Sequence, residues 1–195
     1  LCGKKDLIDA AKRSDIALGF ETSTGFNYAT VARRGASGWA VEVEGKRAHS
    51  SGVFSEGTGA GAIFEMSRIL HQFYTDVKGE DLLTFNPGVL LGGTFVNFDE
   101  LTSKGDAFGK TNVVAQKAVV KGGLRFISEE QKERAREKMR EIVANNLPQT
   151  SASISFTDSY PAMQPTEGNL ALLETLNEVS LDLKQDVSKP DFGRE

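Results

Sequence analysis

Apolar and polar residues alternate one by one along several stretches of this chain, a period that predicts β-strands with one buried face. Trp39, Val41 and Val43 share one face of such a strand, whereas the positions between them and after them carry alanine and glutamate. The same alternation predicts two further strands, at residues 114–126 and 152–156, and the apolar stretch 82–94, with its glycine breaks, predicts another.

Apolar residues that recur every three or four positions predict two amphipathic helices. The first helix follows a loop rich in glycine and serine, and its apolar stripe consists of Ile63, Met66, Leu70, Phe73 and Val77. The second begins after Ser128, which is placed to form a capping box with Gln131. Its apolar stripe consists of Ala135, Met139, Ile142 and Val143.

In chain order these elements are strand, helix, strand, strand, helix and strand. This order predicts an α+β fold of the ferredoxin-like βαββαβ type, with a four-stranded antiparallel sheet and two helices on one face. The polar stretch 98–110, between the second and third strands, is expected to be a turn or an excursion from the sheet.

The segments on either side of this domain follow a different pattern. Before it we expect a short helix over about residues 4–13, a buried strand over 15–20 that ends at Glu21, and a strand over 28–33. After it, apolar residues at steps of three predict one more helix around residues 170–179. Segments this short cannot bury a core of their own.

The simplest domain organisation is therefore an insertion between two parts of a host domain. We expect residues 36–159 to form the inserted domain, with residues 1–35 and 160–195 as stubs of the host. The chain starts without methionine and ends without a terminating pattern, so we expect it to be a piece of a longer protein.

The composition excludes some classes of partner. The 195 residues carry a net charge of −4, with a pI near 5.4, which argues against a nucleic-acid or anionic-membrane partner. No apolar run approaches the roughly 18 residues of a membrane span. Cys2 is the single cysteine and cannot form an internal disulfide, so a cytoplasmic and a periplasmic or secreted location both stay open.

Few residues suggest chemistry on their own. His49 ends the first predicted strand beside small residues, where it is equally consistent with a polar site or a plain surface, and His71 is expected to be a helix-surface or interface residue. Glu21 ends a predicted buried strand. A carboxylate at this place is equally consistent with a functional site and with a solvated strand terminus. Without further context, Asn112 is consistent with a turn residue, and Arg125 is consistent with an exposed structural ion pair.

Five short motifs nevertheless stand in one order along the chain: DIALGFE (residues 15–21), GKRAHS (45–50), TNVV (111–114), GLRF (123–126) and YPA (160–162). In this order they resemble the di-zinc peptidase family that includes glutamate carboxypeptidase, succinyl-diaminopimelate desuccinylase and aminoacylase. GKRAHS is similar to the family's G-K-x-x-H-[SA] signature, which a glycine-rich loop and a long helix follow. Ala115 departs from the family pattern, which often has proline there.

The resemblance implies a catalytic domain with two zinc ions that is interrupted by a ferredoxin-like lid, through which the protein forms a homodimer. The metals would activate a water for hydrolysis of an amide, as in a zinc carboxypeptidase or aminoacylase-like amidohydrolase. Glu21 would be a zinc ligand, and His49 would stabilise the oxyanion in the partner's site. Asn112 and Arg125 would hold the carboxylate end of a small peptide or N-acyl amino acid.

A second hypothesis comes from another class of protein. A ferredoxin-like domain alone does not define a function, so an interaction or small-ligand-sensing module without hydrolytic activity stays open. The parent gene discriminates between the two. A histidine–aspartate metal motif encoded upstream of Leu1 favours the enzyme, and its absence favours the module.

We predict that this chain by itself binds no dinuclear zinc and hydrolyses nothing. The resembled family also uses an H-x-D motif, a bridging aspartate, a Glu-Glu pair and a C-terminal histidine, which have no counterparts in this sequence. A catalytic zinc needs about three protein ligands. The check is chromatography of N-acyl amino acids and dipeptides incubated with the chain and zinc, and turnover would contradict the prediction.

Overall fold

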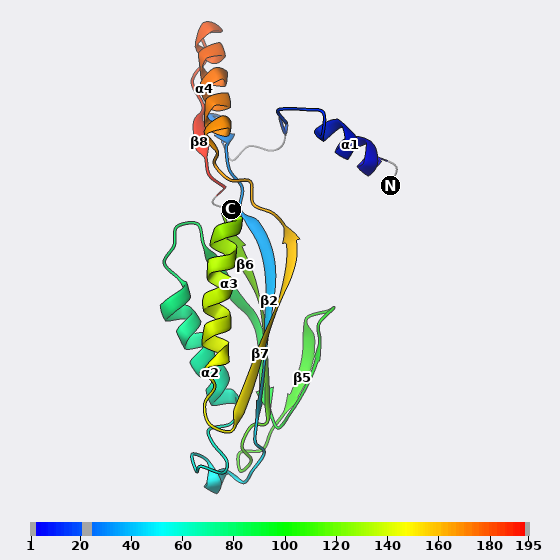
Figure 1. The fold of residues 1–195 in the computed structure, drawn as a ribbon, viewed down its shortest axis with the longest axis vertical. Helices are drawn as coiled ribbons and strands as arrows, with labels where there is room; N and C mark the ends of the chain where they lie inside the picture. The colour runs from blue at the N-terminus through cyan, green and yellow to red at the C-terminus, as the bar shows by residue number, and fades with distance from the viewer. Residues whose placement is uncertain (1–2, 21–24, 194–195) are drawn as a thin grey trace.

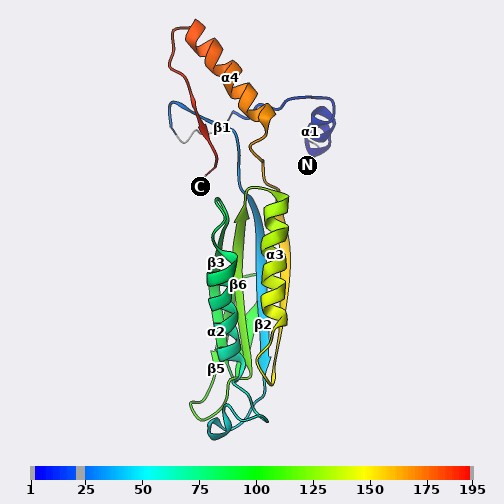
Figure 2. The ribbon, with the colours of Figure 1, turned by 60° about the vertical axis from the view of Figure 1, so that its left-hand side comes forward.

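A computed structural model of the chain describes residues 3–20 and 25–193. Figures 1 and 2 show an elongated molecule, with a helix-covered sheet below and α4, β1 and β8 above. The elements in chain order are α1 (Gly3–Ala11), β1 (Tyr28–Thr30), β2 (Gly35–Gly45), α2 (Ala62–Gln72), β3 (Thr84–Gly93), β4 (Phe95–Asp99), β5 (Lys104–Phe108), β6 (Lys117–Phe126), α3 (Glu129–Ala144), β7 (Thr150–Tyr160), α4 (Glu167–Asp182) and β8 (Lys189–Asp191).

The lower part is built on one sheet with the strand order β3-β6-β2-β7, in which all neighbours are antiparallel. Helices α2 and α3 lie side by side on one face of this sheet (Figure 2). A π-helical turn, Phe73–Val77, continues α2. The predicted ferredoxin-like βαββαβ fold is therefore confirmed. Because β2 and β6 are the inner strands, β3 and β7 are the two edges.

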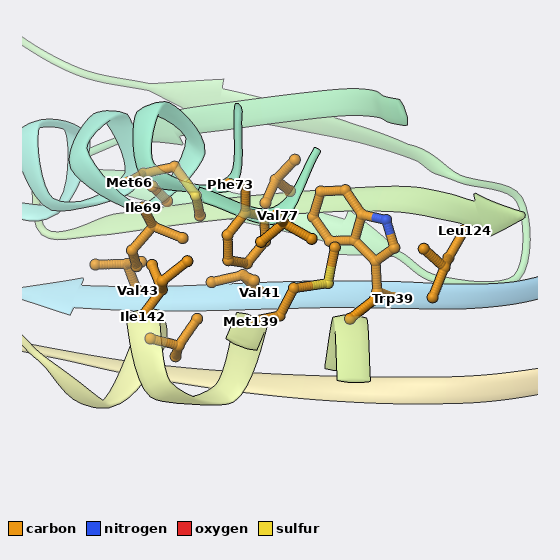
Figure 3. Packing of buried hydrophobic residues seen from close by; sticks show 14 of the residues in the cluster. Trp39, Val41, Val43, Met66, Ile69, Phe73, Val77, Leu124, Met139 and Ile142 are labelled. Atoms are coloured by element: carbon orange, nitrogen blue, oxygen red, sulfur yellow. The ribbon is translucent and has the colours of Figure 1, made fainter. Parts of the chain in front are cut away.

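The core lies between the sheet and the two helices (Figure 3). Trp39, Val41 and Val43 of β2 are almost fully buried, as their alternation predicts. The Trp39 ring meets the edge of Phe73 with ring centroids 5.6 Å apart, and its indole Nε1 donates to the carbonyl of Gly123 at 3.1 Å. The helices contribute Met66, Ile69, Met139 and Ile142 to the core, and β6 contributes Leu124 and Phe126.

The start of α3 confirms the predicted cap. The hydroxyl of Ser128 accepts a hydrogen bond from the Gln131 backbone N–H at 3.1 Å. The Gln131 side chain accepts from the N–H of Ile127 at 2.9 Å, and donates to the carbonyl of Asp81 at 3.0 Å. The Ser128 N-cap is thus confirmed, but the Gln131 side chain bonds the N–H of Ile127 and not that of Ser128, as a full capping box requires, and it joins the helix start to the loop before β3.

The predicted buried strand at residues 15–20 is wrong. These residues follow α1 without regular structure and are exposed, with Phe20 95% accessible. A strand needs a neighbouring strand for its backbone hydrogen bonds, and none of the described residues supplies one here. Glu21, which was expected to end this strand, lies outside the described residues.

The polar stretch after β3 does leave the sheet, as predicted, and it does so as a β-hairpin. Strands β4 and β5 pair antiparallel from Phe95↔Phe108 to Asp99↔Lys104. In Figure 1 this hairpin lies on the side of the sheet opposite α2 and α3.

The two segments that flank the domain meet each other. Strands β1 and β8 pair in parallel, and the Asn169 side chain of α4 donates to the carbonyl of Val31 at 2.9 Å. Val31, Ala32 and Leu173 are buried between them. No helix in the described ranges is long and apolar enough to cross a membrane.

A buried carboxylate ties the two core helices together. Glu65 of α2 is fully buried and pairs with Arg68, with contacts of 2.6 and 3.0 Å. Its Oε2 also accepts from the Leu147 N–H at 3.1 Å, just beyond the end of α3, while Arg68 donates to the carbonyl of Ile142 at 3.1 Å. Every charge in this cluster therefore has a partner, which a buried ion pair requires.

We predict that Glu65→Ala lowers the free energy of unfolding by about 3 kcal/mol, because it leaves the Arg68 guanidinium and the Leu147 N–H without their acceptor. Urea denaturation followed by circular dichroism measures this change. The matched control is Glu42→Ala, which breaks the exposed pair between Glu42 and Lys117 (3.3 Å) and should cost less than about 1 kcal/mol. Equal effects for the two variants would contradict the structural role of Glu65.

Candidate functional site

His49 lies at the far end of the sheet, where two loops meet. The N–H of Val114 donates to the carbonyl of Ala48 at 2.9 Å, and the N–H of Ser50 donates to the carbonyl of Asn112 at 3.0 Å. These bonds clamp the segment after β2 to the segment before β6. The structure therefore brings His49 and Asn112 together, although 62 positions separate them in the sequence.

The glycine that opens the GKRAHS motif has a steric reason to be there. A Cβ on Gly45 would lie 2.6 Å from the backbone nitrogen of Ala62, so only glycine lets the start of α2 approach the end of β2. The Ala62 N–H in turn donates to the carbonyl of Ala115 at 2.9 Å. The motif thus holds the loop after His49 against the loop that carries Asn112.

The His49 ring is held by the next turn of the chain. Its Nδ1 lies 2.8 Å from the Ser51 hydroxyl and accepts from the Ser51 N–H at 3.2 Å. Because Nδ1 accepts, we infer that the neutral ring carries its proton on Nε2. The exposed Nε2–H can then donate to a ligand outside this chain.

Arg125 lies at the opposite end of the sheet. It pairs in register with Ala36 on β2 and Thr84 on β3, and its guanidinium contacts the Tyr160 hydroxyl and ring at the end of β7. The eight residue steps along β6 from Lys117 to Arg125 correspond to about 26 Å. Within one chain, Arg125 cannot reach the same small ligand as Asn112 and His49.

The described residues do not form a metal centre. In the ranges 3–20 and 25–193, no three side chains of histidine, cysteine, aspartate or glutamate gather closely enough to hold an ion. His71 is exposed in the last turn of α2 and belongs to no such cluster. The donor set available here therefore does not fit a dinuclear zinc site.

An apolar groove runs between α2 and the edge strand β3. Its cavity is about 240 Å³, lined by Ile63, Met66, Ser67, Leu90, Gly92 and Ala118. Ile63 and Leu90, at its rim, are 47% and 51% exposed. Half-exposed aliphatic side chains around a groove mark a surface that gains from being covered.

The opposite edge of the sheet is charged. Arg136 and Lys132 of α3 both contact Asp158 of β7, and Arg140 stacks on the ring of Phe156 with its guanidinium carbon 5.2 Å from the ring centroid. The hydrogen bond from Arg136 holds the pKa of Asp158 below its ordinary value. The two edges thus differ in kind, because one is flanked by apolar side chains and the other by basic side chains of α3.

The sequence model of the peptidase dimerisation domain, M20_dimer, matches residues 31–151. This match spans more than half of the chain. The chain belongs to the peptidase dimerisation domain family. The matched range starts just before β2 and ends at the start of β7, so it contains α2, α3 and the strands β2, β3 and β6 of the dimerisation domain, but only the first two residues of β7.

Solved structures share the fold of this dimerisation domain and its flanks. A tripeptidase from Staphylococcus aureus matches with a TM-score of 0.58 and 18% identity over 89% of this chain and 42% of its own. Aminopeptidase PepT from Bacillus cereus matches with a TM-score of 0.60 and 16% identity, also over 89% of this chain and 42% of its own. An amidase of the hydantoinase/carbamoylase family from Burkholderia multivorans matches with a TM-score of 0.56 and 9% identity, over 84% of this chain and 36% of its own.

The chain spans about two fifths of the length of these solved structures. At this level of identity they show the shared fold alone. No curated protein sequence matches the chain.

Sequence reasoning missed the groove of the dimerisation domain. The helical period placed Ile63 on the same stripe as Met66, yet Ile63 is half exposed at the groove while Met66 is buried. The signal that could have found it is the excess width of the apolar stripe on α2, since Ile63 and Leu70 widen it on one side beyond what one sheet face can cover.

Proposed function

We propose that this chain is the lid and dimerisation domain of a zinc-dependent peptidase or amidohydrolase that hydrolyses amide bonds of carboxylate-bearing substrates. The observation that carries the proposal is the contrast between its two sheet edges. Edge β3 is flanked by an apolar groove, whereas edge β7 is flanked by basic side chains of α3, two of which pair with Asp158. In a domain of a dimerisation family, the apolar edge is the one that a second copy would cover.

Pairing two copies at β3 has a geometric consequence. A two-fold axis perpendicular to the sheet joins two β3 strands antiparallel and continues the sheet from one copy into the other. The Gly93 end of one β3 then lies on the same side of the axis as the Thr84 end of the other. Since His49 and Asn112 lie at the Gly93 end and Arg125 pairs with Thr84, the dimer brings the two separated groups toward one place.

This arrangement supports the residue roles that the family resemblance implies. His49, with its proton on Nε2, would donate to the oxyanion that forms in the partner's site. Arg125 would bind the substrate carboxylate through its planar fork, and Asn112 from the other copy would add an amide donor. A small peptide or N-acyl amino acid would then contact both copies at once.

The catalytic domain would lie beyond the flanking segments. We propose residues 1–35 and 160–195 as its stubs and residues 36–159 as the lid. Support comes from the way β1, β8 and α4 pack on one another while large apolar groups around them stay exposed, including Phe26 and Leu183. When bound, zinc would polarise the scissile carbonyl and activate water. Glu21 is the single ligand proposed from this chain, and the others would come from the rest of the protein.

We predict that Leu90→Arg raises the dimer dissociation constant at least about 30-fold, which corresponds to about 2 kcal/mol for a charge placed in the interface core. Light scattering during size-exclusion chromatography over a concentration series measures it. The matched control is Ser153→Arg on the exposed face of β7, which should leave the dimer intact. A chain that stays monomeric at all concentrations would contradict the proposal and favour a non-dimeric interaction module.

Mixing two inactive variants tests the shared site in the full-length protein. We predict that His49→Ala and Arg125→Ala each abolish most of the hydrolysis of a carboxylate-bearing N-acyl amino acid. After unfolding and refolding together at equal ratio, half of the dimers are mixed, and each mixed dimer has one intact composite site. The mixture should therefore recover about a quarter of the wild-type activity.

The controls in this experiment are the two variants refolded separately. Recovery of activity only in the mixture would support one site built from two copies. If the mixture stayed as inactive as its components, His49 and Arg125 would not act in the same composite site.

A further inference from the structure

The β4–β5 hairpin has no role in the function proposed above. It leaves the sheet at the end of β3 and returns at Gly109, just before Asn112. It lies on the face of the sheet that α2 and α3 leave open (Figure 1). Strand β5 lies against β3, and β4 lies against β6 and β3. The hairpin is therefore shifted toward the apolar edge of the sheet.

The hairpin is fixed to the sheet rather than projecting freely. Its inner face buries Val96, and Gly105 packs so closely on β3 that a Cβ there would lie 2.8 Å from a methyl group of Leu91. At the tip, Lys121 of β6 donates to the carbonyl of Glu100 at 2.5 Å. The Asp99 carboxylate closes the turn by accepting from the N–H of Leu101 at 2.9 Å.

The outer edge of β5 has no partner strand among residues 3–20 and 25–193. β5 pairs only with β4, and all five of its residues are exposed. An exposed strand edge is a template for pairing with another strand. Because β5 lies over β3, its free edge faces the same way as the apolar edge of the sheet.

We propose that the β5 strands of two copies pair with each other across the axis that joins the two β3 strands. This inference rests on the dimer of the proposed function and adds a second layer to it. Two β3 strands joined in one sheet lie about 4.8 Å apart. Since each β5 lies on its own β3, the same axis brings the two β5 edges to a spacing at which strands pair.

The sequence of β5 is complementary to itself in this arrangement. Antiparallel pairing centred on Gly105 places Lys104 of each copy opposite Asp106 of the other, which creates two cross-strand pairs of opposite charge. Gly105 is also the residue that packs on Leu91, the neighbour of Leu90 at the groove. A single two-fold axis near these residues would therefore relate the two grooves, the two β3 edges and the two hairpins.

Charge exchange within the full chain tests this pairing. Lys104→Glu and Asp106→Lys each place like charges opposite one another twice per dimer, so each should raise the dimer dissociation constant about tenfold. The double variant, Lys104→Glu with Asp106→Lys, restores two opposite-charge pairs and should return to within about twofold of the wild type. Sedimentation equilibrium measures all four proteins.

Disulfide formation provides a second measurement that does not depend on stability. In a Cys2→Ser background, Lys104→Cys chains mixed with Asp106→Cys chains should form a disulfide under mild oxidation, since directly opposed residues lie about 5 Å apart. The Asp106→Cys chain alone should crosslink far less, because its two cysteines would be about 8 Å apart. The matched control is the mixture of Ser153→Cys and Ser155→Cys chains on β7, which should not crosslink.

The outcomes separate this inference from the proposed function. A dimer that Leu90→Arg disrupts, but that neither charge reversal weakens nor the mixed cysteines crosslink, would overturn hairpin pairing and leave the β3 dimer standing. Pairing of β5 with an unrelated strand would give that same result. A chain that never dimerises would overturn both.

Discussion

The rest of the structure depends on the pleat of β2. This strand pairs with β6 along its whole length and with β7 on its other side, so it is the strand around which the sheet is built. Its alternate side chains Trp39, Val41 and Val43 are buried under two helices, and the positions between them face the open side. A shift of one residue would exchange these two sets, so burial holds the register.

That register also decides where the chemistry can lie. It places the segment with His49 at one end of the sheet and Arg125 at the other, and the close approach of Ala62 to Gly45 holds the His49 loop in position. A rigid sheet of this length keeps the two groups apart in any single copy. His49 and Arg125 can then act in one site only if another copy spans the distance, and the proposed antiparallel continuation at β3 would do so by symmetry.

The sheet has two edges, and the structure treats them differently. At β7, the ion pairs of α3 with Asp158 place charges that another chain would have to desolvate. At β3, the groove between α2 and the strand offers aliphatic side chains instead. The hairpin lies over this same edge, which makes the proposed interface three layers deep: helices, sheet and hairpin.

The sequence by itself determined the fold of the central domain. Burying one face of an element produces a local pattern: alternation in β2, β6 and β7, and a spacing of three to four in α2 and α3. These patterns can therefore be recognised in the sequence without coordinates. The Ser128 cap could be predicted for the same reason, because its hydrogen-bond partner lies within four positions in the sequence. The GKRAHS motif indicated the family, which the match over residues 31–151 confirms.

Only the tertiary structure decided the features that depend on distant neighbours. The stretch 15–20 is apolar enough for a strand but has no described neighbour to pair with. Ile63 follows the helical period, yet its exposure depends on where the edge of β3 ends. Asn112 and Arg125 lie 13 positions apart on one strand and its approach, but β6 is straight, so they lie at opposite ends of the domain. Periodicity reports which face of an element is buried, whereas the length and order of the strands set which residues can meet.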